Sequence, residues 1–455
     1  MGDVVLGLDV GTTSAKATAF DAAGTAAAHA ALTYPQFPPG EQDPEVVVDA
    51  AMRVLRDAGP GAIGISTAMH GLVALDAYDR PLTPLLTWAD TRAVEQAQRL
   101  RSEHPELHDR TGTPLHPMSP LAKLVWFRER QPDVFAAARR WVGLKELILH
   151  RLTGRWLVDW SVASGTGLLE LATLDWCPDA LELAGIEREQ LADLVAPTDV
   201  VGERIVAGGG DGPLANLGVG AVHHGVAALS IGTSGALRLI VEQPVVDRAR
   251  RVFCYALTRD RWAVGGAINN GGVVLQWAHE ALAPELTIDE LLHVASTAPP
   301  GCDGLLMAPY LLAERAPHWT SGATASYVGL RRDHGRAHLV RAALEGVCQQ
   351  LHLVLDSLES AGQEVHEIRA TGGFARSPFW RQLLADVLGR PIGFPESHEG
   401  SGFGAALLGM EALGIIDSID VAADHIRIAD VVAPDEQAAA TYQELLPRFE
   451  ELSEQ

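Results

Sequence analysis

The sequence predicts an α/β protein built from two similar lobes with a cleft between them. Apolar strand-like runs alternate with amphipathic helix-like runs in both halves of the 455-residue chain, a pattern typical of helices packed on sheets. Two stretches, LGLDVGTTSAKATAF and ALSIGTSGALRLIV, share the plan of an apolar strand, a Gly-Thr turn with small hydroxyl residues and a second apolar strand. Because they lie about half a chain apart, they indicate a duplicated domain. We place the boundary near residue 245, which gives lobes of residues 1–245 and 246–455.

The composition limits the class of protein. A hydrophobic content of 47% with 20% charged residues is typical of globular proteins. The formal net charge of −23 argues against nucleic-acid and anionic-membrane partners, since both need clustered cations. The four cysteines form no CxxC pair, which is typical of a reducing compartment. With no room for a signal peptide and no run of roughly 20 apolar residues, we expect a cytoplasmic protein.

The first predicted element is a β-hairpin over VVLGLDVGTTSAKATAFD, from Val4 to Asp21. Small turn residues are ordinary in hairpins, but four residues of this one are not explained by a turn alone: Asp9, Thr12, Thr13 and Ser14. A turn rich in N–H and hydroxyl donors beside a carboxylate suits a phosphate with its Mg²⁺. An ordinary polar hairpin stays open as the alternative, at about even odds.

Helices and strands alternate through the rest of the first half. Asp43 as N-cap, Pro44 in the first turn and Gly59 at the end predict a helix over DPEVVVDAAMRVLRDAG. GAIGIST and GLVALDA read as strands, and residues 89–194 as mostly helical. ERIVAGGGD predicts a strand that ends at Asp211 and precedes the second hairpin.

The second half continues the alternation. We expect strands around residues 253–268, a helix over 273–282 and a long helix over 338–360, whose apolar residues recur at steps of three or four. EIRATGG then reads as a strand into a turn, and SPFWRQLLADVLG as a helix. GSGFGAALLG reads as small residues that let a helix pack closely, because the chain contains neither a P-loop nor a true GxGxxG.

Asp211 is a candidate functional residue because of its neighbours. It stands at a predicted strand end among four glycines, Gly208, Gly209, Gly210 and Gly212. Glycines let a ligand or another backbone approach closely, so the carboxylate is exposed to whatever binds there. Alternatively, Asp211 is the N-cap of a helix over the following PLANLG.

Four motifs in this order and spacing resemble the FGGY carbohydrate kinases: GLDVGTTSAKATAFD, the glycine-flanked Asp211, LSIGTSGA and ATGGFARSPFW. The resemblance covers about residues 4–440 and implies the actin-like, ribonuclease-H-like ATPase fold, with ATP and Mg²⁺ in a cleft between two lobes that close on a sugar. It implies that Asp211 is the catalytic base. It also implies that Asp211 contacts Mg²⁺ and that Asp9 contacts Mg²⁺ through water. The nucleotide contacts that it implies are Gly11, Thr12, Thr13, Ser14, Lys16, Gly232, Thr233, Ser234, Gly272, Gln276, Gly372, Gly373 and Ser377.

The same resemblance implies a sugar site made of Met69, His70, Trp88, Asp90, Arg92, His116 and Asp211. The stretch TGTPLHPMSPLAKLVWF resembles the gluconate kinases of the family more than its xylulose kinases, although Arg130 departs from the usual end of that signature. Arg92, His70 and His116 offer the local positive charge that a sugar-acid carboxylate needs. The same side chains also suit a neutral polyol. We expect gluconate as substrate, with xylulose or another polyol as the alternative.

Fold alone does not establish catalysis, because a nucleotide-driven clamp or a sugar sensor can share it. Asp211 with its glycines and the Trp-containing sugar segment favour an enzyme, since a clamp needs neither. Kinases of this family are often dimers, so a homodimer is a further expectation from the resemblance alone.

Overall fold

The computed structural model describes residues 4–320, 322–396 and 400–453. The chain forms two compact units, each assembled from three segments. Unit 1 contains Met1–His223, Ile240–Val264 and Glu399–Ile426, and unit 2 contains His224–Leu239, Gly265–His398 and Arg427–Gln455. The predicted boundary near residue 245 falls within the middle segment of unit 1, Ile240–Val264. The division into lobes of residues 1–245 and 246–455 stays a prediction.

The first large sheet has the strand order β13-β14-β5-β1-β2-β3. Its strands are β1 (Val5–Val10), β2 (Ser14–Phe20), β3 (Ala26–Thr33), β5 (Ala62–Thr67), β13 (Val200–Gly202) and β14 (Ile205–Gly210). β1 pairs antiparallel with β2 and parallel with β5, and β14 is parallel to β5 and antiparallel to β13. The predicted first hairpin is therefore β1–β2, and its turn is closed by Gly11 N, which donates to Ser14 O at 3.0 Å.

The second large sheet has the order β17-β18-β16-β15-β21-β22-β23. Its strands are β15 (Val226–Ile231), β16 (Gly235–Val241), β17 (Phe253–Ala256), β18 (Trp262–Ile268), β21 (Glu367–Thr371), β22 (Ile392–Pro395) and β23 (Ile428–Val432). β15 pairs antiparallel with β16 and parallel with β21, and β22 is parallel to β21 and antiparallel to β23. Both sheets thus contain a hairpin, two parallel neighbours and an antiparallel strand beyond them. This shared order agrees with the duplication predicted from the two hairpin motifs.

Helix α1 (Pro44–Ala58) forms as its end signals predict. Asp43 Oδ1 accepts hydrogen bonds from Glu45 N at 2.9 Å and from Val46 N at 3.2 Å, and Gly59 follows the last residue of the helix. The apolar face of α1 packs against β2 and β3. It forms part of the hydrophobic core of unit 1 together with β1 and β5.

Residues 89–194 are mostly helical, as predicted. The helices are α2 (Val94–Glu103), α3 (Glu106–Thr111), α4 (Pro120–Arg130), α5 (Pro132–Ala137), α6 (Leu144–Thr153), α7 (Trp160–Ser164) and α8 (Pro178–Ala184). The short strands β4 (Glu41–Gln42), β6 (Val73–Leu75) and β7 (Leu85–Leu86) precede this part of the chain. The short strands that alternate with its helices are β8 (Arg140–Val142), β9 (Leu157–Asp159), β10 (Leu169–Glu170), β11 (Asp175–Trp176) and β12 (Asp193–Val195).

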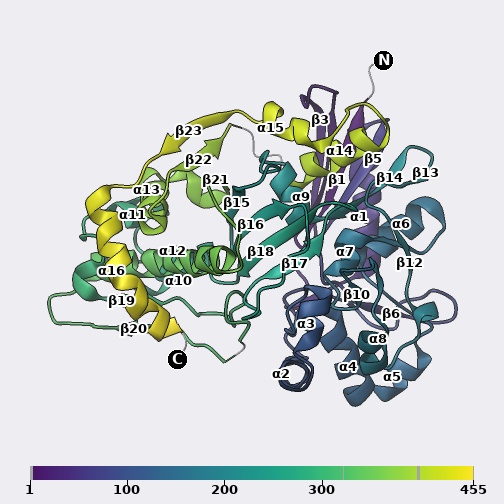
Figure 1. Ribbon diagram of the computed structural model, residues 1–455, viewed down its shortest axis with the longest axis horizontal. Helices are drawn as coiled ribbons and strands as arrows, with labels where there is room; N and C mark the ends of the chain where they lie inside the picture. Colours follow the sequence, from purple (N-terminus) through teal and green to yellow (C-terminus); the bar gives the residue numbers. More distant parts are fainter. Residues whose placement is uncertain (1–3, 321, 397–399, 454–455) are drawn as a thin grey trace. The chain divides into compact units, whose positions relative to one another are not determined.

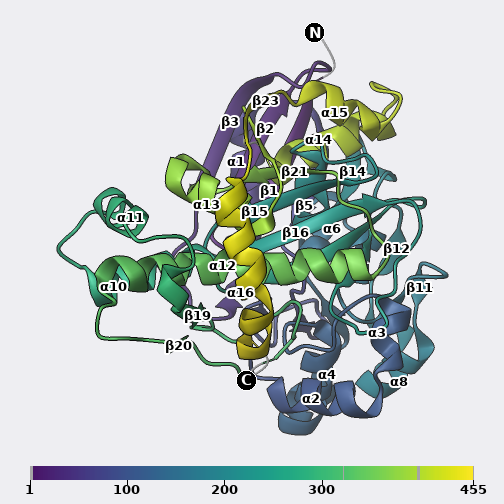
Figure 2. The same cartoon turned by 60° about the vertical axis from the view of Figure 1, so that its left-hand side comes forward.

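Three later helices form where they were predicted: α10 (Gly272–Leu282), α12 (Arg336–Ser360) and α13 (Pro378–Leu388). The others are α9 (Asp211–Leu217), α11 (Ile288–Ser296), α15 (Ala422–His425) and α16 (Glu436–Ser453), and short strands are β19 (Leu306–Ala308) and β20 (Ser326–Val328). In unit 2, α16 packs against α12 and α13 (Figure 2). Within the described ranges, no helix combines the length and the apolar character needed to cross a membrane.

Helix α14 (Gly400–Ala412) packs against the first sheet although it lies late in the chain (Figure 1). It packs against β1, β5 and α9. A Cβ added at Gly7 would lie 2.0 Å from Gly402 O, and one added at Gly64 would lie 2.0 Å from Ala405 O. The interpretation of GSGFGAALLG as a closely packed helix is therefore confirmed.

Candidate active site

Asp211 is the first residue of α9 and directly follows β14. Gly210 is the N-cap of that helix, so the interpretation of Asp211 as N-cap is wrong. The Asp211 side chain is half-buried, and its Oδ1 accepts a hydrogen bond from Gly212 N at 2.7 Å. Gly208 has φ +74°, and a Cβ there would lie 1.8 Å from Ile65 O. The glycines therefore let β14 approach β5 closely just before Asp211.

Met69 and His70 follow β5 and lie beside the same strand end. A Cβ on Gly210 would lie 2.5 Å from Met69 Sδ, which places Met69 against the residue before Asp211. His70 has φ +66°, a left-handed conformation that costs a non-glycine residue of order 1–3 kcal/mol. Its carbonyl oxygen accepts a hydrogen bond from Lys123 Nζ at 2.8 Å. Strained residues of this kind cluster at functional sites, which supports the prediction for His70.

The ring of His70 has a defined tautomer. Its Nδ1 lies 2.6 Å from Gly165 O, and because a carbonyl oxygen only accepts, Nδ1 carries the proton. In the neutral ring, Nε2 is then an acceptor, suited to a substrate hydroxyl. The geometry fits hydroxyl recognition without any charge on the ring.

His116 lies in the loop before α4, and that loop is anchored to the same turn as His70. Thr113 Oγ1 donates to Ser164 O, next to the Gly165 carbonyl that His70 contacts. Met118 N donates to His116 Nδ1 at 3.2 Å, so Nδ1 of His116 has no proton and Nε2 carries it in the neutral ring. His116 therefore has a donor at Nε2 where His70 has an acceptor.

Arg92 is held between two carboxylates. Its Nε donates to Asp90 Oδ2 at 2.8 Å and its Nη2 to Glu41 Oε1 at 2.6 Å. Burial lowers the pKa of Arg92, but the hydrogen bonds to Glu41 and Asp90 more than reverse this, and the pKa is raised overall. One guanidinium with two carboxylates leaves the group negative, which disfavours Arg92 as the main partner of a substrate carboxylate. Its contact with substrate stays a prediction.

Trp88 and the first hairpin turn line one pocket of about 380 Å³ in unit 1. Thr12 and Thr13 come from the turn, and Gln42 Nε2 fixes it by donating to Thr12 O at 2.6 Å. The turn was predicted to hold phosphate and Trp88 to contact sugar. The structure brings these two predicted groups to the same cavity.

Asp9 is the next-to-last residue of β1 and is partly buried. Ser66 Oγ donates to Asp9 Oδ1 at 2.9 Å, and Lys16 is opposite Asp9 in the β1–β2 register. Burial raises the pKa of Asp9, while hydrogen bonds from Ser401 and Ser66 and the charge of Lys16 oppose this rise. Mg²⁺ commonly takes one or two carboxylates and keeps several waters. Because burial disfavours the negative charge of Asp9, a nearby cation such as Mg²⁺ would stabilise it. The hydrogen bond from Ser401, on α14, was not predicted from the sequence.

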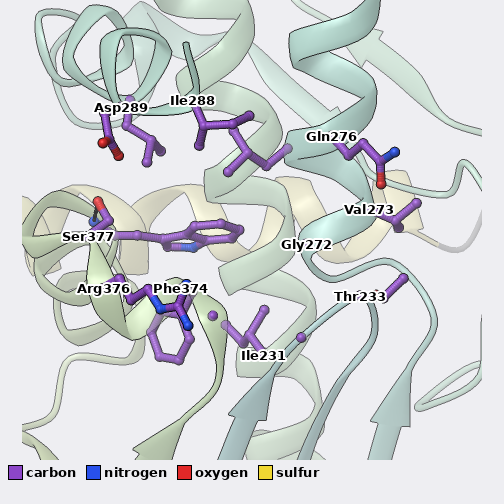
Figure 3. Close-up of a pocket in the computed structure, with 15 residues that line it drawn as sticks. Ile231, Thr233, Gly272, Val273, Gln276, Ile288, Asp289, Phe374, Arg376 and Ser377 are labelled. Carbon is purple, nitrogen blue, oxygen red and sulfur yellow. Dashed lines mark hydrogen bonds between the residues drawn. The ribbon is translucent and has the colours of Figure 1, made fainter. Parts of the chain in front are cut away.

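Unit 2 contains a pocket of about 470 Å³, within the usual range for small-molecule sites. Figure 3 shows Ile288, Asp289 and Gln276 on one side of it and Ile231, Phe374 and Arg376 on the other. Its lining includes six residues predicted to contact nucleotide: Gly232, Thr233, Gly272, Gln276, Gly373 and Ser377. The structure thus gathers residues from three sequence motifs around one cavity of small-molecule size.

Gly372, which was also predicted to contact nucleotide, and two residues of the lining shape the main chain around this pocket. Gly372 has φ +114°, and a Cβ there would lie 2.1 Å from Ile231 O, so only glycine lets β21 turn against β15. Gly272 N donates to Gly232 O at 2.7 Å, and Gly271 abuts the carbonyl of Ser234. Ser377 is also the N-cap of α13, since its Oγ accepts from Trp380 N at 3.2 Å.

Two elements of the site carried no functional signal in the sequence. Helix α11 contributes Ile288, Asp289 and Leu292 to the nucleotide-sized pocket; its capping box at Thr287 and Glu290 marks a helix start but not what the helix faces. Helix α7 ends at the turn that contacts both His70 and Thr113. A five-residue helix has too short an apolar period to reveal such a role.

Comparison with known families gives a match in both halves of the chain. Residues 4–209 match the N-terminal domain of the FGGY family of carbohydrate kinases. Residues 227–413 match the C-terminal domain of the same family.

Similar proteins of known name include kinases for two sugars. A gluconokinase of Bacillus licheniformis is 40% identical over 100% of this chain and 96% of its own length. A xylulose kinase of Escherichia coli (strain K12) is 31% identical over 99% of this chain and 98% of its own. Two crystal structures from Lactobacillus acidophilus, described as a gluconate kinase and a ligand-bound xylulose kinase, are each 35% identical, with a TM-score of 0.94 and coverage of 99% of this chain and 97% of theirs.

Proposed function

This chain belongs to the FGGY family of carbohydrate kinases, and from that premise we propose that it is an ATP-dependent gluconokinase, which phosphorylates D-gluconate at its terminal primary hydroxyl to give 6-phosphogluconate. The observation that carries the choice of acceptor is the 40% identity to a gluconokinase over the whole chain, against 31% to a xylulose kinase. Xylulose kinase is the second candidate, because a structure described as a xylulose kinase is as similar as one described as a gluconate kinase.

In the proposed reaction, Asp211 accepts the proton of the attacking hydroxyl. Its place at the first residue of α9, after a run of glycines, exposes the carboxylate to an acceptor beside Met69 and His70. Hydrogen-bond donors of the Gly11–Ser14 and Gly232–Ser234 turns hold the phosphates. Mg²⁺, when bound near Asp9, offsets charge on the phosphate oxygens. Positioning and charge stabilisation carry most of the catalysis in phosphoryl transfer, so the residues act mainly by orienting the two substrates.

The two histidines supply complementary contacts for the acceptor. His70 Nε2, an acceptor in the neutral ring, receives a hydrogen bond from a substrate hydroxyl. His116 Nε2, a donor, is better suited than Arg92 to meet a carboxylate, since Arg92 is already held by Asp90 and Glu41. A donor meeting a carboxylate forms a charge-assisted bond, roughly twice as strong as a neutral one.

The experiment that tests the proposal is a panel of sugars and sugar acids assayed for ADP release. A kinase releases ADP only when an acceptor is present, whereas a clamp or sensor hydrolyses ATP, if at all, without transfer to sugar. We expect ADP release to depend on the acceptor and to be most efficient with gluconate. Release that is independent of every acceptor would count against the kinase proposal itself.

A further inference from the structure

The strand that carries Asp211 is bulged where it pairs with β5. The parallel register runs Ile205 to Ile63 and Val206 to Gly64, and then resumes with Gly209 to Ser66 and Gly210 to Thr67. Between these pairs, two residues of β14, Ala207 and Gly208, stand opposite one residue of β5, Ile65. Bulges next to active sites commonly redirect a side chain. This one lies just before Asp211 and interrupts the ladder, so buried carbonyl groups there need other partners.

Lys145 supplies those partners. Its side chain is 0% exposed, and its Nζ donates to Ile65 O at 2.8 Å, Ala207 O at 2.9 Å and Gly209 O at 3.1 Å. An ammonium has three N–H donors and no acceptor, so its hydrogen-bonding capacity matches three carbonyls. Burying the charge needs a counter-ion, which Asp159 Oδ2 provides at 3.3 Å.

A second connection holds the same segment from α7. Asp159 Oδ1 caps that helix by accepting from Val162 N at 2.9 Å. Ser161 Oγ accepts a hydrogen bond from Gly210 N at 3.1 Å. Gly210 is the residue directly before Asp211, so α7 and Lys145 fix the main chain on which the proposed base stands.

We propose that Lys145, Asp159 and Ser161 form a positioning network that sets the orientation of Asp211, with Lys145 as its principal member. The inference rests on the proposed function in so far as Asp211 is the base. None of the three side chains needs to touch substrate. The network acts through the bulge, because Lys145 binds two carbonyls of β14 and one of β5 directly before Asp211.

Lys123 offers a matched comparison within the same unit. It is also 0% exposed, and its Nζ donates to His70 O at 2.8 Å and Thr87 O at 2.7 Å. These carbonyls precede or belong to residues proposed to contact the acceptor rather than to the strand of Asp211. Loss of Lys145 should therefore affect the chemical step, and loss of Lys123 should affect acceptor binding.

The test compares Lys145→Met with Lys123→Met in the full-length enzyme. For Lys145→Met we expect kcat to fall by about 100-fold, the cost of a displacement of about 1 Å at the reacting groups, with KM for the acceptor within about threefold of the parent. The dissociation constant for ADP, measured by calorimetry, should stay unchanged, because the proposed nucleotide pocket lies in unit 2. For Lys123→Met we expect KM to rise about tenfold with kcat within about threefold. A folded Lys145→Met variant with the parental kcat, or with a raised KM alone, overturns the proposal.

Ser161→Ala keeps the inference testable if Lys145→Met fails to fold. The substitution removes only the hydrogen bond from Gly210 N and leaves Lys145 paired with Asp159, so we expect the variant to fold. We expect kcat to fall about tenfold, which corresponds to the loss of one hydrogen bond, and KM to stay unchanged. Parental kcat in Ser161→Ala would overturn the network. All rates are measured with the acceptor that the parent enzyme uses best. If gluconate is not that acceptor, the parent enzyme shows it, and the comparison of the variants is still valid.

Discussion

The position of Asp211 is set by the glycines and the bulge that precede it. Its Oδ1 accepts a hydrogen bond from Gly212 N, and the strand before it contains Gly208 at φ +74°. A run of glycines before an acidic residue is visible in the sequence, and it marked this residue as a candidate, which stays a prediction. The bulge and its buried lysine were not visible, because they depend on a pairing between segments about 60 to 140 residues apart.

Asp211→Asn should abolish phosphoryl transfer while leaving nucleotide affinity intact. Asparagine keeps the size of the side chain but cannot accept the hydroxyl proton, and loss of a general base usually costs ~10²–10⁴-fold in rate. Single-turnover rates with saturating acceptor measure the step directly, and calorimetry with ADP checks the nucleotide pocket. A variant within tenfold of the parent would remove Asp211 from the mechanism.

Glu41→Gln should improve binding of a sugar acid by releasing part of the positive charge of Arg92. In the parent, Arg92 is shared between Glu41 and Asp90, and partly exposed ion pairs are worth only about 0–1 kcal/mol. We therefore expect KM for gluconate to fall by about two- to fivefold, with KM for xylulose unchanged. Glu129→Gln, which removes a carboxylate paired with Arg99, is the matched control. Equal effects of Glu41→Gln on both acceptors would show that Arg92 does not sense the substrate carboxylate.

Helices and strands with strong end signals were predictable, whereas what each element faces was not. Helix α1 forms between Asp43 and Gly59 because a side-chain cap and a terminal glycine are local features. The contributions of α7 and α11 to the site depend on tertiary packing, which no local pattern encodes. The small residues of α14 predicted its close packing, but not that Ser401 would hydrogen-bond Asp9.

Two glycines of α14 provide a matched pair for testing its packing. A Cβ at Gly404 would lie 2.1 Å from Leu214 O, whereas one at Gly402 would lie 3.7 Å from its nearest neighbours. Gly404→Ala should destabilise the protein by about 1–3 kcal/mol through overpacking, although alanine favours helix by about 1 kcal/mol. Gly402→Ala, which gains the same helix propensity without the clash, should be neutral or stabilising. Thermal unfolding of both variants decides this; equal midpoints would contradict the described contact between α14 and α9.

At the scale of the whole molecule, a duplicated domain was predicted because two similar hairpins are recognisable in the sequence, and the strand orders of the two sheets agree with it. The return of residues 399–426 to unit 1 was not foreseen, since it is a long-range pairing late in the chain. The two turns proposed to hold phosphates belong to different compact units: Gly11–Ser14 to unit 1 and Gly232–Ser234 to unit 2.

If both turns bind one ATP, the units should come together when the substrates bind. Small-angle scattering should then give a smaller radius of gyration with gluconate and a non-hydrolysable ATP analogue than with either ligand alone, as in other enzymes whose domains close on substrate. Calorimetry under the same conditions establishes saturation. An unchanged radius at saturation would contradict closure and leave the assignment of the two turns without support.

The most direct test of the proposed function is an internal competition between acceptors. The enzyme receives equal concentrations of gluconate and xylulose with limiting ATP, and mass spectrometry of the two products gives the ratio of their kcat/KM values. A site that pairs a donor with the substrate carboxylate should favour gluconate by at least about tenfold, because an interaction of about 1.4 kcal/mol corresponds to that factor. We therefore predict that 6-phosphogluconate exceeds xylulose 5-phosphate at least about tenfold. An excess of xylulose 5-phosphate would contradict the gluconokinase proposal while leaving the protein a carbohydrate kinase.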